Sequence, residues 1–187
     1  MRPSEASFFD FHWVLPTLAI GGRIPDGEYA SFVQKTGVTH AVDLRAEECD
    51  DRQEWARHRV RFLSLPTPDL RPVLLADLDR GVDWIRNAVR SGGVVYVHCE
   101  HGIGRSVLLS LCFLVSEGIP PLAAMKRIKA LREKASPSPS QIDALLEWCR
   151  AYSLRTGVAI ELCDWNALSD AAYRPKFWSE ESIGALR

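Results

Sequence analysis

One stretch of nine residues, "HCEHGIGRS" at positions 98–106, concentrates groups that could do chemistry. It lies between the apolar runs "VVYV" and "VLLSL" and contains a cysteine, two glycines and an arginine. Cys99 could act as a nucleophile, because a thiolate attacks electrophilic centres and forms covalent intermediates. Arg105 carries a planar guanidinium that can bind two oxygens of one phosphate group. Together these residues predict a site at which Cys99 attacks a bound phosphate ester.

The segments on either side predict where this stretch lies in the fold. Residues 94–97 are continuously apolar, which is typical of a strand buried on both faces. Residues 106–118 are apolar on nearly every side, which predicts a helix at the centre of a domain. A loop between the end of such a strand and the start of such a helix lies where α/β proteins bind ligands.

The predicted loop also has the features of an anion-binding site. Backbone N–H groups at a helix start lack intrahelical partners, and the helix dipole favours an anion there. Gly102 and Gly104 allow the backbone to turn successive N–H groups toward one point. We expect these groups to lower the pKa of Cys99 below the ordinary thiol value of about 8.5. The alternative is a small buried cysteine in a glycine-containing turn, with Arg105 as a surface cation, but the glycines and the strand–loop–helix order favour a phosphate-binding loop.

The same residues carry a family resemblance. Residues 98–106 resemble the H-C-x-x-G-x-x-R-[S/T] signature of cysteine-dependent protein tyrosine phosphatases. The small size and the chain order resemble the atypical dual-specificity branch of that superfamily. The likeness extends from about Trp13 to Tyr152 and includes "WVLPTLA" and "GVTHAVDL". It implies that the phosphate loop consists of Glu100, His101, Gly102, Ile103, Gly104 and Arg105.

The resemblance also implies a general acid, which in this family is an aspartate about thirty residues before the cysteine. Asp69, in "LPTPDLRPV", lies thirty residues before Cys99 and is the candidate. It would protonate the departing oxygen and then activate water, whereas the alternative is an aspartate that stabilises a turn. The family triplet Trp-Pro-Asp is here Thr67-Pro68-Asp69, a departure also usual in the dual-specificity branch. Weaker candidates lie in charged or helical segments: Asp50, Asp51 and Asp77.

Four further residues resemble supporting members of the family site or lie near it. Ser106 resembles the hydroxyl that helps the cysteine sulfur leave, and it could also cap a helix. His98 resembles the histidine that orders the cysteine backbone, and the alternative is a satisfied core histidine. Gln141 resembles a glutamine that positions water in some branches, and an exposed glutamine at a helix start is an equal alternative. For Arg45 we favour a solvated arginine over one that reaches the pocket rim.

The variable loop positions bear on the substrate. Branches that act on phosphoinositides usually carry lysines where this chain has Glu100 and His101, which argues against a polyanionic lipid. The chain lacks a tyrosine-rich recognition loop, which favours a shallow site for phosphotyrosine, and also phosphoserine and phosphothreonine, in proteins. Inositol phosphates, RNA 5′-phosphates and carbohydrate phosphates stay open as substrates. A non-catalytic phosphate-binding module, or a sulfur-transfer or arsenate-reducing enzyme, is disfavoured by the presence of Asp69.

Composition limits the cofactors, partners and location. The loop amides and Arg105 supply the positive field, so we expect neither a metal nor another cofactor. A formal net charge of −1 argues against a nucleic-acid binder. The five cysteines show no C-x-x-C spacing, and the N-terminus lacks an apolar signal segment, which together predict a reduced, cytoplasmic setting. The longest apolar run, residues 107–115, is too short to cross a membrane, so the expected partner is a phosphorylated protein or small phosphoester, with the oligomeric state left open.

Apolar periodicity predicts the remaining elements. Strands are expected at residues 13–22, 39–44, 60–65 and 94–97, and helices near 27–37, 47–59, 73–91, 106–118, 120–134 and 136–152. This alternation predicts an α/β fold with a central, mostly parallel sheet flanked by helices. We expect one catalytic domain at residues 1–153. Residues 154–187 form an extension whose aromatic residues predict packing on the same domain: Trp165, Tyr173, Phe177 and Trp178.

Overall fold

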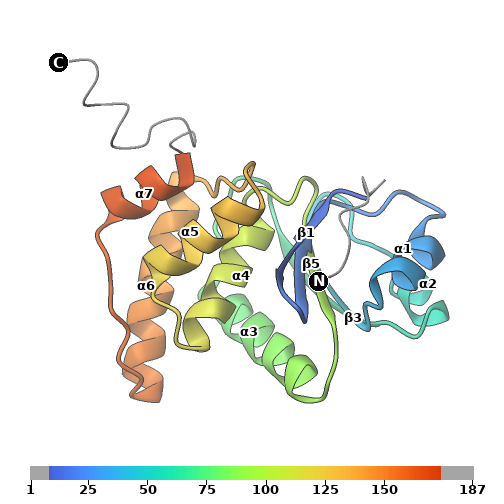
Figure 1. Ribbon diagram of the computed structural model, residues 1–187, viewed down its shortest axis with the longest axis horizontal. Coiled ribbons are helices and arrows are strands. Elements are labelled where there is room, and N and C mark those ends of the chain that lie inside the picture. Colours follow the sequence, from blue (N-terminus) through green and yellow to red (C-terminus); the bar gives the residue numbers. More distant parts are fainter. Residues whose placement is uncertain (1–8, 174–187) are drawn as a thin grey trace.

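The computed structural model describes residues 9–173, and its centre is a five-stranded sheet. The strands are β1 (Phe11–Leu15), β2 (Leu18–Gly21), β3 (His40–Arg45), β4 (Arg61–Thr67) and β5 (Val95–His98). Their order across the sheet is β1-β2-β5-β3-β4, and β1 alone runs antiparallel to its neighbour. The expected α/β fold with a mostly parallel sheet is therefore confirmed (Figure 1).

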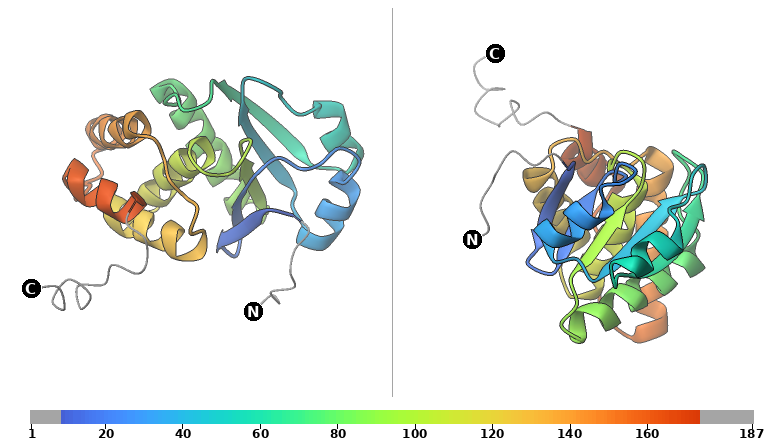
Figure 2. Two further views of the ribbon diagram at one scale, coloured as in Figure 1. Left: turned by 90° about the horizontal axis from the view of Figure 1, so that it is seen from above. Right: turned by 90° about the vertical axis from the view of Figure 1, so that its right-hand side faces the viewer.

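Helices cover both faces of the sheet in unequal layers. On one face lie α1 (Tyr29–Thr36) and α2 (Arg52–Arg57). On the other lie α3 (Leu75–Arg90), α4 (Arg105–Ser116), α5 (Pro121–Leu131), α6 (Pro139–Thr156) and α7 (Trp165–Tyr173). The view from above shows the sheet between these two layers (Figure 2).

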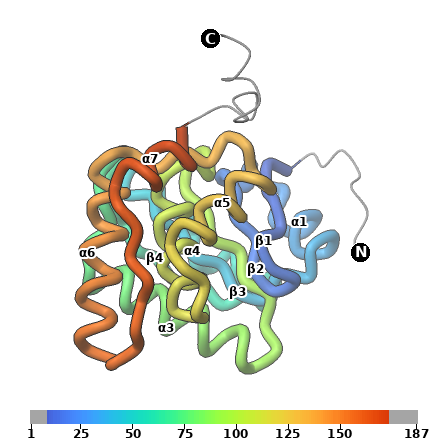
Figure 3. The backbone as a smooth tube through the Cα atoms, turned by 60° about the vertical axis from the view of Figure 1, so that its left-hand side comes forward, coloured from blue at the N-terminus to red at the C-terminus, as the bar shows by residue number. Residues whose placement is uncertain are grey.

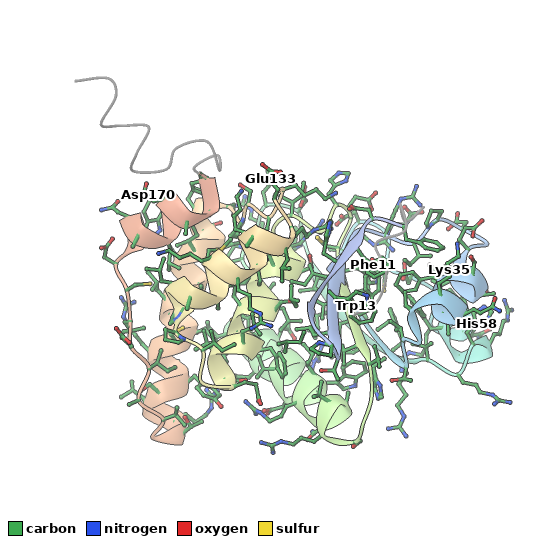
Figure 4. The ribbon with its side chains drawn as sticks, in the orientation of Figure 1. Phe11, Trp13, Lys35, His58, Glu133 and Asp170 are labelled. Atoms are coloured by element: carbon green, nitrogen blue, oxygen red, sulfur yellow. The ribbon has the colours of Figure 1, made fainter. Side chains whose placement is uncertain are left out.

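Side-chain alternation along the strands explains the two layers. On β5, Val95 and Val97 belong to the core beneath the larger helical layer, whereas Tyr96 belongs to the core beneath α1 and α2. Successive residues of a strand point to opposite faces, so a continuous apolar run fits a strand covered on both sides. At the sheet edge, Phe11 and Trp13 project from β1 toward the side of α1, with their rings edge to face at 5.8 Å (Figure 4).

The parallel strands place all their C-terminal ends along one edge of the sheet. Cys99 follows β5, Asp69 follows β4 and Glu47 follows β3, so segments far apart in the sequence meet there. The helix that starts at this edge, α4, is buried from Arg105 to Val115, as its apolar composition predicts. This geometry is the usual ligand-binding position of a parallel α/β sheet.

Two predicted boundaries were wrong. The single strand expected at residues 13–22 is a hairpin of β1 and β2, because Pro16 and Thr17 turn the chain. The helix expected at residues 47–59 is limited to α2, which begins after the Asp51 side chain accepts a hydrogen bond from Gln53 N. The residues before α2 form a loop at the functional edge of the sheet, which frees Glu47 for the site.

The segment after α6 runs back along that helix to α7 (Figure 3). Helix α7 packs against α5 and α6, and its residues Leu168 and Ala172 join the main core. Phe177 and Trp178 lie outside the described residues. Within residues 9–173, no helix has the length and apolar composition needed to span a bilayer.

Candidate active site

The loop between β5 and α4 turns its carbonyl groups outward. Each of the five carbonyls of residues 100–104 accepts a hydrogen bond from outside the loop or from α4. In order along the loop, the donors are Arg23 N (3.0 Å), Arg132 Nη2 (2.9 Å), Arg132 Nε (2.6 Å), Ser136 N (2.9 Å) and Leu108 N (2.8 Å). In a trans peptide, the C=O and the following N–H point in opposite directions. The N–H groups of residues 101–105 therefore face the other side, where they form an anion-binding cup.

Two close approaches fix this loop. Gly102 has a φ of +64°, and a Cβ atom there would come within 2.4 Å of the Gly21 backbone. Arg132, at the end of α5, is fully buried and braces the loop from behind, with Asp10 as its counterion at 2.9 Å. Sequence reasoning missed Arg132, because a charged residue at the end of an amphipathic helix is ordinarily solvated.

Cys99 lies at the bottom of the cup, with only 3% of its surface exposed. Its Sγ is 3.5 Å from the Ser106 hydroxyl. Burial opposes ionisation of the thiol, but hydrogen bonds from the Ser106 side chain and backbone, the charge of Arg105 and the Gly102 N–H outweigh it and lower the pKa of Cys99. The thiolate is the nucleophilic form, so the loop favours the reactive state.

Arg105 is buried and holds two acidic side chains beside the cup. Its Nη1 and Nη2 each donate to one carboxylate oxygen of Glu47 at 2.7 Å, and Nη1 also donates to the Thr67 carbonyl. Among residues 9–173, Arg105 Nε is buried without a hydrogen-bond partner. An unsatisfied buried donor is unfavourable, so Nε is a donor that a phosphate oxygen could satisfy.

Glu47 is the second residue that sequence reasoning missed. Its hydrogen bonds with Arg105 lower the pKa of Glu47 to about 2, against the opposing effect of burial. Nothing in "RAEEC" distinguishes Glu47 from Glu48, because the contact depends on how the loop after β3 meets the start of α4. Glu47 keeps the Arg105 guanidinium in place while leaving Nε free.

Asp69 reaches the same guanidinium from the loop after β4. Its Oδ1 lies 3.0 Å from Arg105 Nη2, and 63% of its side chain is exposed. The carboxyl is open to solvent, and its position beside Arg105 places it next to the cup. The weaker candidates do not reach this position: Asp50 is buried in another network, Asp51 caps α2, and Asp77 pairs with Arg80.

Behind the cup, His98 belongs to a buried ionic network. His98 Nε2 lies 3.2 Å from Asp50 Oδ2, without the alignment of a hydrogen bond. Burial opposes the protonated form, but Asp50 and Asp43 raise the pKa of His98. Asp43, Asp50 and His98 have the spacing of metal ligands. The carboxylates are already occupied, however, since Asp50 pairs with Arg45 and accepts the Trp55 indole N–H at 2.9 Å.

Arg45 is buried, so the prediction of a solvated side chain was wrong. It is only 3% exposed, because it pairs with Asp43 at 3.2 Å and with Asp50. It also pairs with Glu100 at 3.2 Å, and Arg23 pairs with the other oxygen of Glu100 at 3.1 Å. Because Arg45 is already paired with Asp43 and Asp50, Arg23 is the guanidinium that offsets the charge of Glu100, which weakens the electrostatic argument against a polyanionic lipid.

Gln141 is buried, contrary to the alternative of an exposed glutamine. Its Oε1 accepts from Ser138 N at 2.9 Å in a capping box, and its Nε2 donates to the Arg71 carbonyl at 3.0 Å. A Cβ atom at Gly104 would come within 2.5 Å of Oε1, so the amide lies directly against the phosphate loop. His101 is exposed at the rim of the loop, whereas Ile103 is half-buried.

Known proteins with similar sequences support the interpretation of this geometry. The model of the dual specificity phosphatase catalytic domain matches residues 22–151. The chain is 28% identical over 160 residues to the human protein named phosphatidylglycerophosphatase and protein-tyrosine phosphatase 1, covering 82% of this chain and 80% of that protein. It is 34% identical over 132 residues to dual specificity protein phosphatase 1B of Arabidopsis thaliana, covering 68% and 75% of the two chains.

A solved structure agrees with the sequence relatives. The crystal structure of PTPMT1 superposes with a TM-score of 0.72 at 26% identity, covering 79% of this chain and 98% of that chain. A second crystal structure holds PTPMT1 in complex with PI(5)P, with the same TM-score of 0.72 and coverage of 78% and 97%. The matched region contains both the cysteine loop and the Asp69 loop.

Proposed function

The chain belongs to the dual specificity phosphatase family and is a phosphatase, and within that class we propose that it removes phosphate from phosphotyrosine, and from phosphoserine and phosphothreonine, in proteins. The supporting observation is that the Cys99 loop and Asp69 meet at one buried guanidinium. Arg105 lies between the Cys99 loop and Asp69, whose Oδ1 is 3.0 Å from Nη2. A module that only binds phosphate has no need of a proton donor beside the bound ester.

The first proposed step transfers the phosphoryl group to the enzyme. The Cys99 thiolate attacks phosphorus while the loop N–H groups and Arg105 Nε bind the phosphate oxygens. The bond between phosphorus and the leaving oxygen breaks, and Asp69 donates its proton to that oxygen. The product alcohol or phenol departs and a cysteinyl-phosphate remains.

The second proposed step releases phosphate. Asp69, now ionised, takes a proton from water, whose oxygen attacks phosphorus and breaks the sulfur–phosphorus bond. The Ser106 hydroxyl, 3.5 Å from Sγ, donates to the departing thiolate. The transition state of phosphoryl transfer is loose, so positioning and electrostatic stabilisation carry most of the rate. His98 supports Cys99 from behind. Both amide atoms of Gln141 are already hydrogen-bonded, which supports a bracing role for it over the positioning of water.

Lipid phosphomonoesters are a second candidate class. Two observations favour them: Arg23 pairs with Glu100 and offsets its charge, and the relative with 80% coverage is named for phosphatidylglycerophosphatase as well as protein-tyrosine phosphatase activity. In addition, Leu70 and Leu74, next to Asp69, are 69% and 71% exposed. These apolar side chains could contact the hydrocarbon part of a lipid substrate.

We also propose domain boundaries and a cellular location for the enzyme. Residues 1–153 form the catalytic domain, which contains every residue of the proposed mechanism, and residues 154–187 form an extension. All five cysteines are free, which supports the reduced cytoplasm as its location. No metal or other cofactor takes part in the proposed steps, and the partner is the phosphorylated substrate itself.

The decisive experiment compares three proteins on a panel of substrates. Wild type, Cys99→Ser and Asp69→Asn are assayed with an aryl phosphate, with phosphotyrosine and phosphoserine peptides, and with dispersed phosphatidylglycerophosphate. We expect Cys99→Ser to be inactive on every substrate, and phosphotyrosine peptide to give the highest kcat/KM. Turnover by Cys99→Ser at the wild-type rate would overturn the mechanism. A higher kcat/KM for the lipid would replace the protein substrate by the second candidate class.

A further inference from the structure

The loop that carries Asp69 has a backbone conformation that its own side chains do not explain. Leu70 has a φ of +60°, in the left-handed region that branched L-residues rarely adopt. Its side chain is 69% exposed, so packing does not hold the residue there. A backbone hydrogen bond within the loop, from Arg71 N to the Pro68 carbonyl at 3.2 Å, closes this turn. Because the residue directly before Leu70 is the proposed general acid, a contact with the rest of the fold is needed to fix where the turn, and with it Asp69, lies.

That contact comes from the start of α6. The Ser138 hydroxyl donates to the Leu70 carbonyl at 2.9 Å, and the Ser140 hydroxyl donates to the same oxygen at 3.3 Å. Gln141 Nε2 donates to the next carbonyl, that of Arg71, at 3.0 Å. Three side chains within one helical turn therefore hold two consecutive carbonyls of the Asp69 loop.

Ser138 is itself fixed by the helix. It is the N-cap residue of α6, where its Oγ accepts from Gln141 N and its own N–H donates to Gln141 Oε1 at 2.9 Å. The same Gln141 Oε1 lies against Gly104 of the phosphate loop. The start of α6 thus contacts both the Asp69 loop and the phosphate-binding loop, and it sets their relative position.

We propose that Ser138, assisted by Ser140, is a positioning residue for the general acid: its hydroxyl holds the Leu70 carbonyl and thereby keeps Asp69 against Arg105. The inference rests on the proposed function, because it needs Asp69 to donate the proton. Ser138 touches neither substrate nor the reacting atoms. Losing it would reduce proton donation and leave nucleophilic attack by Cys99 intact.

One pair of substitutions separates this role from helix capping. Ser138→Thr keeps a hydroxyl that both accepts and donates. Ser138→Asp keeps a strong N-cap acceptor for Gln141 N but has no proton to donate to the Leu70 carbonyl when ionised. Because Ser140 can take over the same acceptor, the test variant is Ser138→Asp with Ser140→Ala. The matched control is Ser91→Ala, which removes an exposed serine hydroxyl that donates to the Asn87 carbonyl at the far end of α3.

The readout is the dependence of kcat/KM on the leaving group, over aryl phosphates that release phenols of increasing basicity. A poor leaving group needs the proton in the transition state, and general acid catalysis contributes about 10²–10⁴-fold. We expect Ser138→Asp with Ser140→Ala to lose about tenfold on the most basic phenol and little on the least basic. Ser138→Thr and Ser91→Ala should follow wild type, and the alkaline side of the pH profile should flatten in the test variant.

Asp69→Asn distinguishes failure of this inference from failure of the proposed function. If Ser138 acts through Asp69, its substitution should have no further effect in the Asp69→Asn background. An equal loss for every leaving group, or an undiminished additional loss in that background, overturns the positioning role alone. If the leaving-group dependence of Asp69→Asn is no steeper than that of wild type, Asp69 is not the acid, and the proposed mechanism and this inference both fail.

Discussion

Replacing Arg132 with methionine should weaken both the fold and the reaction, because this guanidinium holds two carbonyls of the phosphate loop. Arg132 is fully buried and donates to Gly102 O at 2.6 Å, His101 O at 2.9 Å and Asp10 Oδ1 at 3.1 Å. Methionine replaces the aliphatic part of the side chain and has no donors. The loop carbonyls would then lose their partners and the peptide groups would be free to rotate, which would turn N–H groups out of the cup.

The magnitude follows from each contact. Gly102 is buried, so its carbonyl would lose a charged hydrogen bond without gaining water, at a cost of about 1.5–3 kcal/mol. His101 is exposed and its carbonyl can hydrate, which limits that loss to about 0.5–1.5 kcal/mol. Asp10 is 44% exposed and keeps Lys134, so it adds less than about 1 kcal/mol. The total is about 2–5 kcal/mol, below the stability of about 5–15 kcal/mol of a typical domain, so the variant should fold.

The assay combines urea unfolding with kcat/KM on an aryl phosphate. We expect Arg132→Met to lose about 2–5 kcal/mol and about a hundredfold in kcat/KM, since small misplacements of reacting groups have effects of that size. Asp10→Asn leaves the buried guanidinium without its counterion but keeps its hydrogen bonds to the two loop carbonyls, so this variant should lose stability with a smaller loss of kcat/KM than Arg132→Met. A folded Arg132→Met with kcat/KM within twofold of wild type would refute the claim that Arg132 shapes the cup.

Three further predictions test the environment of the site. Ser106→Ala should raise the pKa of Cys99, seen as a shift to higher pH in the rate of alkylation by iodoacetamide; an unmoved midpoint contradicts this. Glu47→Gln should destabilise the protein by about 1–2 kcal/mol at pH 7, a value reduced because the carboxylate is 40% exposed. The hydrogen bonds from Arg105 lower the pKa of Glu47 to about 2 despite the opposing effect of burial. The stability difference should therefore be full above pH 4.5 and vanish as the pH falls through 2. A pH-independent difference in urea unfolding would rule out the ion pair. Gly102→Ala should abolish turnover, because its Cβ would meet the Gly21 backbone at 2.4 Å, whereas Gly118→Ala, with a φ of +88° and open space, should lose about 1 kcal/mol and keep its kcat/KM.

The parts of the site that lie on one continuous segment were predictable from the sequence. Cys99, Arg105 and Ser106 share a loop whose position follows from the strand before it and the helix after it. Asp69 was suggested by the family resemblance, and its loop follows a second strand of the same parallel sheet, which brings it to the same edge. Periodicity identifies such strands and helices because burial on one or both faces imposes a repeat on the apolar residues.

The parts that depend on contacts between separate segments were not predictable. Glu47 and Arg132 pair with the loop only because β3 and α5 end beside it, and neither residue interrupts its local pattern. Arg45 was misjudged for the same reason. Its burial is tolerated only because Asp43 and Asp50 supply compensating charges, and that compensation is visible only when the loop after β3 is folded back.

The two carboxylates on Arg105 differ in ways that divide the proposed work between them. Glu47 binds both terminal nitrogens at 2.7 Å, and such a bidentate pair strongly favours the ionised form and a fixed geometry. Asp69 contacts one of those nitrogens at 3.0 Å and is 63% exposed, so it is held by fewer contacts than Glu47 and is open to solvent. Environment rather than residue type therefore separates an anchor from an acid, as in other sites where two carboxyl groups share one pocket. Because Glu47 already fixes Arg105, the proposed role of Asp69 requires only that it leave the guanidinium when phosphate arrives, where it would protonate the oxygen that departs.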